Sequence, residues 1–464
     1  MANGLAMRIL PVGWSIGLPI LAVMSVCFLG VSRLSATSSW DGKTQAEYVV
    51  TVETEKPDAL YKKGEDVTFK ITLEQNKQPV PEGKVYWKIS KDNAEPVQNG
   101  TADIKDGVAT VTGKLDEPGF LRCDVNFASP SQGNLTAAAA AGIDVTAIRP
   151  ALPVPDDFVA FWEGKKKELA ALPMDPKMTE VPAPADRPGT RVFDVQIACT
   201  GGAPVSGYYS MPTDAKPKSA PALLIVDGAG VRNSDFLGPI RYAQKGFIAM
   251  TINAHGIPNG KPKEFYAALD SGELKDYRVR GRDNRHAFYF VGMYLRVLRA
   301  LQFLQAQPEW DGHTLMIMGG SQGGGQAIAG AALEPKVTYT FAAIPGLCDF
   351  AGATAGRIGG WPKPIPKGPD GKPDPVVVEA TRYADGANMA TMIKSPIHFY
   401  IGFVDLITPP TCEYAAYNVI PGPKSVDNRP ANGHNHDDPK FWTMVSETLV
   451  NKAKEQQGGA VVTP

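Results

Sequence analysis

Paired cysteines and blocks of like charge are both missing from this chain of 464 residues. Its five cysteines stand singly, and no C-x-x-C pair occurs. This spacing is not typical of a zinc site or a disulfide framework, so we expect Cys123, Cys199, Cys348 and Cys412 to be buried free thiols. The 47 basic and 48 acidic residues nearly cancel and form no basic stripe. The charge pattern therefore gives no reason to expect nucleic acid as a partner.

The N-terminal segment, residues 1–36, differs in composition from everything after it. Arg8 precedes an apolar run from Ile9 to Val31, and Arg33 to Ala36 follow before a polar stretch. A basic start, an apolar run and small residues are typical of an export signal. The run is also long enough to span a bilayer, so a membrane anchor through residues 9–31 stays an alternative to a cleaved signal. Both alternatives predict an exported protein, periplasmic, extracellular or anchored at the cell surface.

Short segments with alternating apolar residues fill residues 46–148. Six strands are predicted there, at Tyr48–Thr54, Val67–Leu73, Lys84–Ile89, Val108–Thr112, Phe120–Phe127 and Ile143–Thr146. Turn signals separate them, and Trp87 is a candidate core aromatic. About seven short strands in such a length are typical of an immunoglobulin-like β-sandwich. The proline-rich residues 149–155 are then interpreted as a semi-rigid linker.

Residues 156–453 alternate between apolar strands and amphipathic helices, and residues 454–464 are expected to be a flexible tail. Strands are expected at Ala222–Val226, Phe247–Asn253, Tyr339–Ile344 and Ile397–Phe403. Asp156 or Asp157 is a candidate cap for the first helix, and the last helix is expected to begin near Asp438. Such alternation predicts a largely parallel sheet covered by helices on both faces, with its ligand at the carboxyl ends of the strands.

A glycine-rich join lies late in this region, in the stretch "HTLMIMGGSQGGGQAIAGAAL". Glycine inside a helix costs about 1 kcal/mol relative to alanine, so this cluster needs a compensating role. Gly319, Ser321 and Gly323 fit the G-x-S-x-G pattern, in which a sharp strand-to-helix turn lifts a nucleophilic serine above the sheet. A tight packing turn or a phosphate loop is the alternative. The Gly-Lys-Ser/Thr of a P-loop is lacking, and a dinucleotide fingerprint usually opens its domain.

A nucleophilic serine requires a base and an orienting acid, which follow it along the chain in this fold. His434, in the polar loop "PANGHNHDDP", is the preferred base, with His436 as the alternative and His398 interpreted as a half-buried strand residue. Asp405 follows the strand Ile397–Phe403 and is the candidate acid, whereas Asp437 and Asp438 are interpreted as helix-capping charges.

Backbone amides are the expected stabilisers of a tetrahedral oxyanion. The amide of Gln322 lies at the start of the helix after Ser321. Gly228, Ala229 and Gly230 follow an earlier strand, and Ala229 is chosen from among them as the second donor. His255 in "NAHGIPNG" is expected to bond within its own turn, with pocket lining as the alternative.

Several stretches together resemble the acetyl xylan esterase and cephalosporin C deacetylase family, carbohydrate esterase family seven. They are "PDDFVAFW", "GRDNRHAFYFVGMYLRVLRAL", "GGSQGGGQAIAGAAL", "PGLCDF" and "IGFVDLITPPTCEYAAYN", between about Pro155 and Leu449. The resemblance implies an α/β-hydrolase fold, with Ser321 as nucleophile, Asp405 as acid, His434 as base, and the amides of Gln322 and a residue near Ala229 as the oxyanion hole. It also implies deacetylation of small sugars or acetylated oligosaccharides, and a ring-shaped homo-oligomer.

The chain departs from that family at three places. Ala254-His255-Gly256 replaces an Arg-Gly-Gln turn, His434-Asn435 replaces a His-Glu pair, and residues 356–375 form a proline- and glycine-rich insertion expected near the pocket mouth.

The hypothesis is an exported serine esterase that works through an acyl-enzyme and needs no metal or organic cofactor. Two alternatives remain: a peptidase or broader carboxylic ester hydrolase on the same fold, and a catalytically retired glycan-binding or scaffold protein. The N-terminal sandwich is expected to be a spacer rather than a glycan-binding module.

Overall fold

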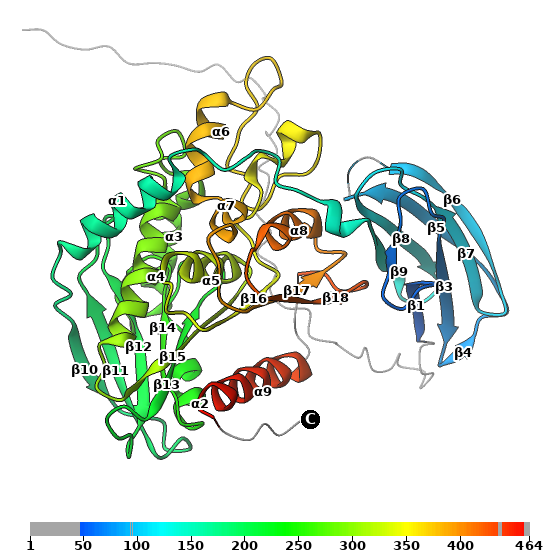
Figure 1. The fold of residues 1–464 in the computed structure, drawn as a ribbon. Coiled ribbons are helices and arrows are strands. Elements are labelled where there is room, and N and C mark those ends of the chain that lie inside the picture. The colour runs from blue at the N-terminus through cyan, green and yellow to red at the C-terminus, as the bar shows by residue number, and fades with distance from the viewer. Residues whose placement is uncertain (1–46, 93, 95, 435–438, 459–464) are drawn as a thin grey trace, which may run out of the picture. The chain divides into compact units, whose positions relative to one another are not determined.

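The computed structural model describes residues 47–92, 94, 96–434 and 439–458. The apolar segment at residues 9–31 and the last residues of the predicted tail lie outside this part of the chain. Within the described residues, no helix combines the length and apolarity that a membrane crossing requires. Two regions with different strand arrangements follow each other, an N-terminal β-domain up to Ile143 and a larger region of alternating strands and helices (Figure 1).

The N-terminal β-domain is built from strands that pair in the order β1-β3-β7-β6-β5-β8-β9-β2, with β4 beside β3. All these pairs are antiparallel except β2 with β9. The strands are β1 (Tyr48–Thr54), β2 (Leu60–Tyr61), β3 (Val67–Gln75), β4 (Gln78–Pro79), β5 (Glu82–Lys91), β6 (Pro96–Lys105), β7 (Val108–Gly113), β8 (Gly119–Ser129) and β9 (Gly133–Ile143).

The period-two pattern predicted most of these strands but failed at the alanine-rich one. The predicted strand Ile143–Thr146 is wrong, because Ile143 ends β9 and Val145–Ala147 form a 3-10 turn. Both β9 and β6 were missed by the pattern. Alanine favours helix locally, but β9 pairs with β8 along its whole length, from Gly133 opposite Ser129 to Ile143 opposite Gly119. Trp87 is only partly buried and packs at the edge of the domain's core.

The second region contains one sheet in the order β10-β11-β12-β14-β13-β15-β16-β17-β18. The pairs from β10 to β14 are antiparallel and the rest are parallel. The strands are β10 (Lys177–Val181), β11 (Thr190–Ile197), β12 (Val205–Pro212), β13 (Ala220–Val226), β14 (Ile248–Ile252), β15 (Trp310–Gly320), β16 (Tyr339–Ala343), β17 (Ile397–Gly402) and β18 (Lys424–Arg429).

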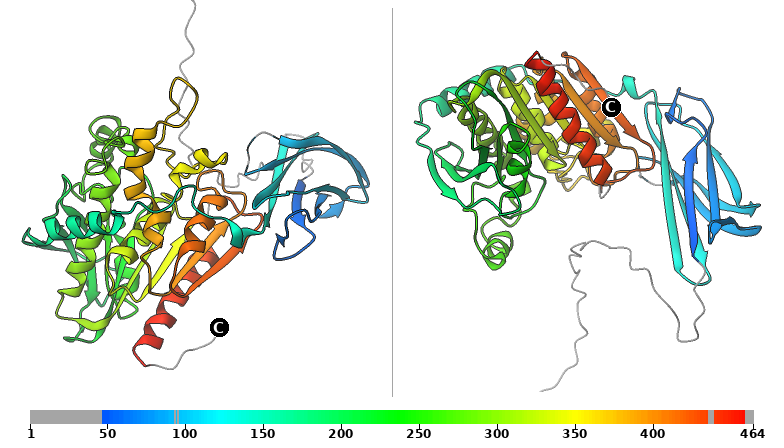
Figure 2. Two further views of the ribbon diagram at one scale, coloured as in Figure 1. Left: turned by 45° about the horizontal axis from the view of Figure 1, so that its top comes forward. Right: turned by 90° about the horizontal axis from the view of Figure 1, so that it is seen from below.

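Helices cover both faces of this sheet, as the alternation predicted. Residues of α2 and α9 pack on one face, while α4, α5 and α8 lie over the other (Figures 1 and 2). The helices are α1 (Phe158–Ala170), α2 (Leu237–Ala243), α3 (Lys263–Ser271), α4 (Tyr289–Gln305), α5 (Gln322–Leu333), α6 (Pro375–Thr381), α7 (Gly386–Ala390), α8 (Pro410–Val419) and α9 (Pro439–Gln456).

One detail at the start of α1 was decided by tertiary contacts. Helix α1 buries Phe158, Phe161, Trp162 and Leu169 as expected. Asp157 precedes it, but its carboxylate makes no capping bond there; it pairs with Arg285, 2.7 Å away, and accepts a hydrogen bond from Tyr383. The expected cap was therefore wrong, because the carboxylate found a charged partner across the fold.

The carboxyl ends of β13, β15 and β17 reach the same edge of the sheet because these strands run parallel. They deliver Gly228, Ser321 and Asp405 to that edge. The candidate site therefore lies where the strand arrangement predicts it.

Candidate active site

Ser321 lies at a strained join between β15 and α5. Strand β15 ends at Gly320 and α5 begins at Gln322, and Ser321 between them has φ 59° and ψ −124°. A serine with this positive φ costs about 1–3 kcal/mol and persists only where the surrounding structure enforces it. Backbone strain at a single residue between a strand and a helix marks that residue as a functional candidate.

The glycines at the join make room for backbone that passes very close. A Cβ on Gly323 would lie 2.2 Å from the carbonyl oxygen of Val226, and one on Gly319 would lie 2.4 Å from that of Gly323. Neither distance is physically allowed for carbon. Glycine at position 323 is unfavourable for a helix, but it is required because α5 packs directly against the end of β13.

Three side chains from distant segments form a continuous chain of short hydrogen bonds. Ser321 Oγ lies 2.9 Å from His434 Nε2, and His434 Nδ1 lies 2.7 Å from Asp405 Oδ2. Asp405 follows β17 and is 3% exposed. The structure thus brings together the three residues that the sequence placed far apart.

The bonds of Asp405 determine how the imidazole is protonated. An ionised carboxylate only accepts hydrogen bonds, so Nδ1 carries the proton and Nε2 presents its lone pair to the serine hydroxyl. The amides of Ile407 and Thr408 donate to Asp405 Oδ1 at 2.7 and 2.9 Å, and the Thr408 hydroxyl donates to Oδ2 at 2.9 Å. Asp405 is therefore held from two sides. Thr408 was not predicted from the sequence, where its only signal was its place three residues after Asp405.

The two expected oxyanion donors lie on either side of Ser321. Gln322 is fully buried as the first residue of α5, where the amides of a helix start have no intrahelical partner. Ala229 lies in the loop after β13, and a Cβ on its neighbour Gly228 would be 3.7 Å from the Cβ of Ser321. Arg232 donates to the carbonyls of Ala229 and Gly228 at 2.6 and 3.2 Å, which fixes the peptide planes of this loop.

Residues around His255 contact both segments that carry the expected oxyanion donors. The expectation that the His255 ring bonds within its own turn is wrong. His255 Nε2 lies 3.2 Å from the carbonyl oxygen of Gly230, and Nδ1 lies 2.8 Å from the Tyr289 hydroxyl. Tyr277, whose ring meets His255 edge to face, donates its hydroxyl to Gln322 Oε1 at 2.7 Å. Burial, with the positive charge of Arg296 nearby, lowers the pKa of His255 to about 4. The ring is neutral at pH 7 and contacts the loop of residues 228–230 through the Gly230 carbonyl.

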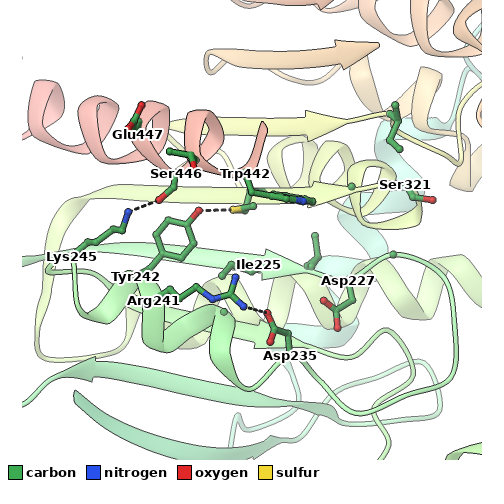
Figure 3. Close-up of a pocket in the computed structure, with 18 of the residues that line it drawn as sticks. Ile225, Asp227, Asp235, Arg241, Tyr242, Lys245, Ser321, Trp442, Ser446 and Glu447 are labelled. Carbon is green, nitrogen blue, oxygen red and sulfur yellow. Dashed lines mark hydrogen bonds and ion pairs between the residues drawn. The ribbon is translucent and has the colours of Figure 1, made fainter. Parts of the chain in front are cut away.

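A groove of about 1040 Å³ leads away from the serine between α2 and α9. Figure 3 shows Ser321 at one end of it and Lys245 and Glu447 at the other. Its floor is apolar, with Ile225 and Met318, while charged and aromatic side chains form its walls: Asp227, Asp235, Arg241, Lys245 and Trp442. The groove is much larger than an acetyl group and suits an amphipathic ligand with a polar body.

The expected insertion, residues 356–375, places one side chain near the start of α5. A Cβ on Gly346 would lie 3.1 Å from the ring of Trp361 and 3.6 Å from the amide nitrogen of Gln322. The Trp361 carbonyl accepts a bond from the Leu347 amide at 2.9 Å. The Trp361 ring thus packs on Gly346, close to the Gln322 amide, and it was not predicted from the sequence.

The remaining candidates fall outside this arrangement. His398 lies in β17, stacks on Phe341 and bonds to Ser425 at 2.8 Å, which confirms its interpretation as a strand residue. His436, Asp437 and Asp438 lie outside the described residues. The four cysteines within the described chain are free thiols; Cys199 is half-buried and the other three are buried. Among the described residues, no cluster of His, Cys, Asp or Glu has a metal-binding arrangement.

Comparisons with known proteins show which family the chain resembles. A family model described as acetyl xylan esterase matches residues 143–446. An acetyl esterase, Axe7A, of Xylanibacter ruminicola is 29% identical over 413 residues, which are 87% of this chain and 89% of that protein.

Two solved structures share the fold of the second region. An acetyl xylan esterase from Paenibacillus sp. R4 is 25% identical with a TM-score of 0.57, over 66% of this chain and 98% of that one. Acetyl xylan esterase 1 from Thermoanaerobacterium sp. JW/SL YS485 is 21% identical with a TM-score of 0.55, over 66% and 96%.

Proposed function

The chain belongs to the acetyl xylan esterase family and is a serine carboxylic ester hydrolase with an α/β-hydrolase fold, and from this premise we propose that Ser321, His434 and Asp405 are its catalytic triad. The observation that carries the proposal is the hydrogen-bond chain from Ser321 Oγ through His434 to Asp405. Its order and spacing are those that a serine nucleophile, a general base and an orienting acid require.

In the proposed reaction, Ser321 Oγ attacks the ester carbonyl while His434 Nε2 takes its proton. The negative charge that develops on the carbonyl oxygen is stabilised by the amides of Gln322 and Ala229. His434 then gives the proton to the leaving alcohol, which leaves an acetyl group on Ser321. A water molecule, deprotonated by the same imidazole, attacks this acyl-enzyme; as the bond to Ser321 Oγ breaks and acetate leaves, His434 returns the proton to Oγ.

We propose an acetylated sugar or oligosaccharide as the substrate. The named relatives are acetyl esterases or acetyl xylan esterases, and the groove beside Ser321 supplies an apolar floor with polar walls suited to a sugar body. Trp442 is 47% exposed at this groove and offers a flat surface for a sugar ring.

Export is proposed from the N-terminal segment, with a cleaved signal and an anchor through residues 9–31 as its two forms. Three further parts of the proposal come from the sequence alone. They are a homo-oligomer, an immunoglobulin-like topology for the N-terminal β-domain, and domain limits at residues 46–148 and 156–453.

The decisive experiment is a panel of acetyl, butyryl and longer esters, run on the wild type and on Ser321→Ala. We expect the wild type to hydrolyse acetylated xylo-oligosaccharides and p-nitrophenyl acetate rapidly and butyryl esters much more slowly. Ser321→Ala should hydrolyse none of these esters. A fluorophosphonate probe should label the wild type at Ser321. Folded wild-type protein that neither hydrolyses these esters nor takes the label would refute the triad, and equal rates on long acyl chains would favour a broader ester hydrolase.

A further inference from the structure

The N-terminal β-domain contacts the second region through one face of β8 and β9. Along β8, Leu121 and Cys123 point into the core of the β-domain itself, whereas Phe120 and Arg122 alternate onto the opposite face. The ring of Phe120 packs edge to face against Phe403, with 4.8 Å between centroids. Phe403 lies two residues before Asp405. A strand far from the active site in sequence is thus packed against the segment that carries the acid.

Arg122 makes the most direct of these contacts. Its Nη1 donates to the carbonyl oxygen of Val404 at 2.7 Å, one residue before Asp405. Its other nitrogens hold Asp124 in a fork, with Nε 2.9 Å and Nη2 2.6 Å from Oδ1. Arg122 is only 8% exposed. Because Asp124 fixes the plane of the guanidinium, the bond to Val404 restrains the peptide that leads into Asp405.

The β-domain also binds the loop that carries His434. The Ala140 amide of β9 donates to the carbonyl of Pro430 at 2.9 Å. The Val404 amide, on the peptide bond preceding the one that Arg122 binds, donates to the carbonyl of Asn432 at 3.2 Å. Asn432 is two residues before His434. Hydrogen bonds therefore run from β8 to the acid segment and from there to the histidine loop, and β9 binds that loop directly.

A third contact joins the β-domain to α8, the helix that follows the loop containing Asp405. Asp92, at the end of β5, accepts a hydrogen bond from the Thr411 hydroxyl, and both residues are buried. At the other end of α8, the Asn418 side chain donates to the carbonyls of Val145 and Ile148 at 2.7 and 2.9 Å, in the segment that directly follows the β-domain. A flexible spacer would not place buried polar pairs and an aromatic contact on the segments that carry two members of the triad.

We propose that the N-terminal β-domain is a positioning element of the active site, and that Arg122 acts through Val404 to hold Asp405, and through Val404 and Asn432 to hold His434. This inference rests on the proposed triad. It replaces the expectation that the domain is a spacer. Misplacement of a catalytic group by about 1 Å can cost up to about 100-fold in rate, so a restraint on the peptide before Asp405 has a measurable effect on turnover.

The test compares Arg122→Met with wild type on p-nitrophenyl acetate, a substrate too small to need a glycan-binding surface. We expect kcat per labelled serine to fall by roughly tenfold while KM stays within twofold, because the restraint concerns the triad and not the groove. Arg122→Lys keeps the charge and one donor but cannot bind Asp124 and Val404 as a fork, so we expect an intermediate kcat.

The matched control is Arg191→Met. Arg191 also holds a carboxylate in a fork, with Glu180 at 2.9 and 3.0 Å, but on β11 and the edge strand β10, away from the triad loops. We expect its kcat to equal that of the wild type. Folding of each variant is checked by thermal unfolding and serine labelling.

A folded Arg122→Met protein with kcat within twofold of the wild type would overturn the proposal, as would an equal loss in Arg191→Met. If Arg122→Met does not fold, Arg122→Lys decides: a threefold or larger loss of kcat supports the proposal, and a smaller one overturns it. Failure of the triad itself is distinguished because the wild type would then lack activity and serine labelling.

Discussion

The two sides of Ser321 are built by different physical means. On the side of Ser321, the glycines at positions 319 and 323–325 fix the turn by steric exclusion, because neighbouring backbone lies where a Cβ on any of them would collide. On the side of the acid and the histidine, Asp405 and His434 are held by hydrogen bonds from Thr408, nearby amides and the β-domain. Steric fixation leaves no intermediate state, whereas a polar network loses its restraints one at a time. Substitutions should therefore abolish function on the first side and weaken it by steps on the second.

The sharpest break is expected from Gly323→Ala. Its Cβ would lie 2.2 Å from the Val226 carbonyl oxygen, so α5 must move away from β13 and the serine with it. Because the displaced hydroxyl can no longer attack the ester, we expect kcat/KM to fall by about 10⁵-fold or more, with a lowered unfolding temperature. Gly320→Ala is the matched control, because a Cβ there meets nothing closer than 3.9 Å. Similar losses in both variants would show that steric exclusion at Gly323 is not what shapes the turn.

Asp405→Asn should come next and should act without a large structural change. Asparagine keeps the shape and accepts the Ile407 and Thr408 amides through its oxygen. Its NH₂ group then faces His434 Nδ1 and favours the wrong tautomer, which in other triads costs about 10⁴-fold in kcat. We expect a loss of that order for p-nitrophenyl acetate, with near-normal unfolding. Asp235→Asn, a groove carboxylate 3.9 Å from Arg241, should lose less than fivefold; if both lose equally, Asp405 has no special role.

The side of the site that contains Ser321 was more predictable from the sequence than the side that contains Asp405 and His434. Ser321 and Gln322 belong to one contiguous motif, and the identity of Gly319 and Gly323 already implied close backbone contact. Asp405 and His434 were found from chain order and from their places after a strand and in a polar loop. Thr408, Tyr277 and Trp361 carried no comparable signal, because their roles come from partners that are distant in sequence or belong to another turn.

The same distinction between local pattern and distant partners explains which strands and contacts were not predicted from the sequence. The parallel strands β13, β16 and β17 appeared as apolar runs, since both their faces are buried. The edge strands β10 and β18 are largely exposed or half-buried, so they lack a periodic pattern and exist because a neighbour offers hydrogen bonds. The contact between the β-domain and the acid loop was also invisible, because Arg122 and Asp124 are by pattern an ordinary solvent-facing pair.

Thr408→Val tests whether the polar side weakens by steps. Valine keeps the amide bond to Asp405 Oδ1 but removes the hydroxyl that donates to Oδ2, so one restraint of several is lost. We expect kcat to fall by about tenfold, or about 1.4 kcal/mol, which is near the lower end of the roughly 1.5–3 kcal/mol of one hydrogen bond to a charged group. Thr408→Ser, which restores the hydroxyl, should recover most of the rate. A loss as large as in Asp405→Asn would show that this side is also all-or-none.

The smallest expected effect on activity belongs to Asp92→Asn, which tests the interface through stability. Burial raises the pKa of Asp92 from 3.8 to about 6, although the Thr411 hydroxyl and the charge of Lys91 act in the opposite direction. A folded-state pKa above the unfolded value means that the folded protein holds the proton more tightly. The contribution of Asp92 to stability is therefore complete below about pH 4 and is lost as the pH rises through 6.

Asparagine resembles the protonated acid, because its oxygen can still accept from Thr411 while its NH₂ takes the place of Oδ2, which has no hydrogen-bond partner among the described residues. We expect the two proteins to unfold alike near pH 4, and Asp92→Asn to be more stable by on the order of 2 kcal/mol at pH 8, with kcat within twofold of wild type. Urea unfolding at both pH values measures the difference. A stability difference independent of pH would mean that Asp92 stays ionised in the fold, so that the interface between the β-domain and α8 contains a charge and not a neutral hydrogen-bonded pair.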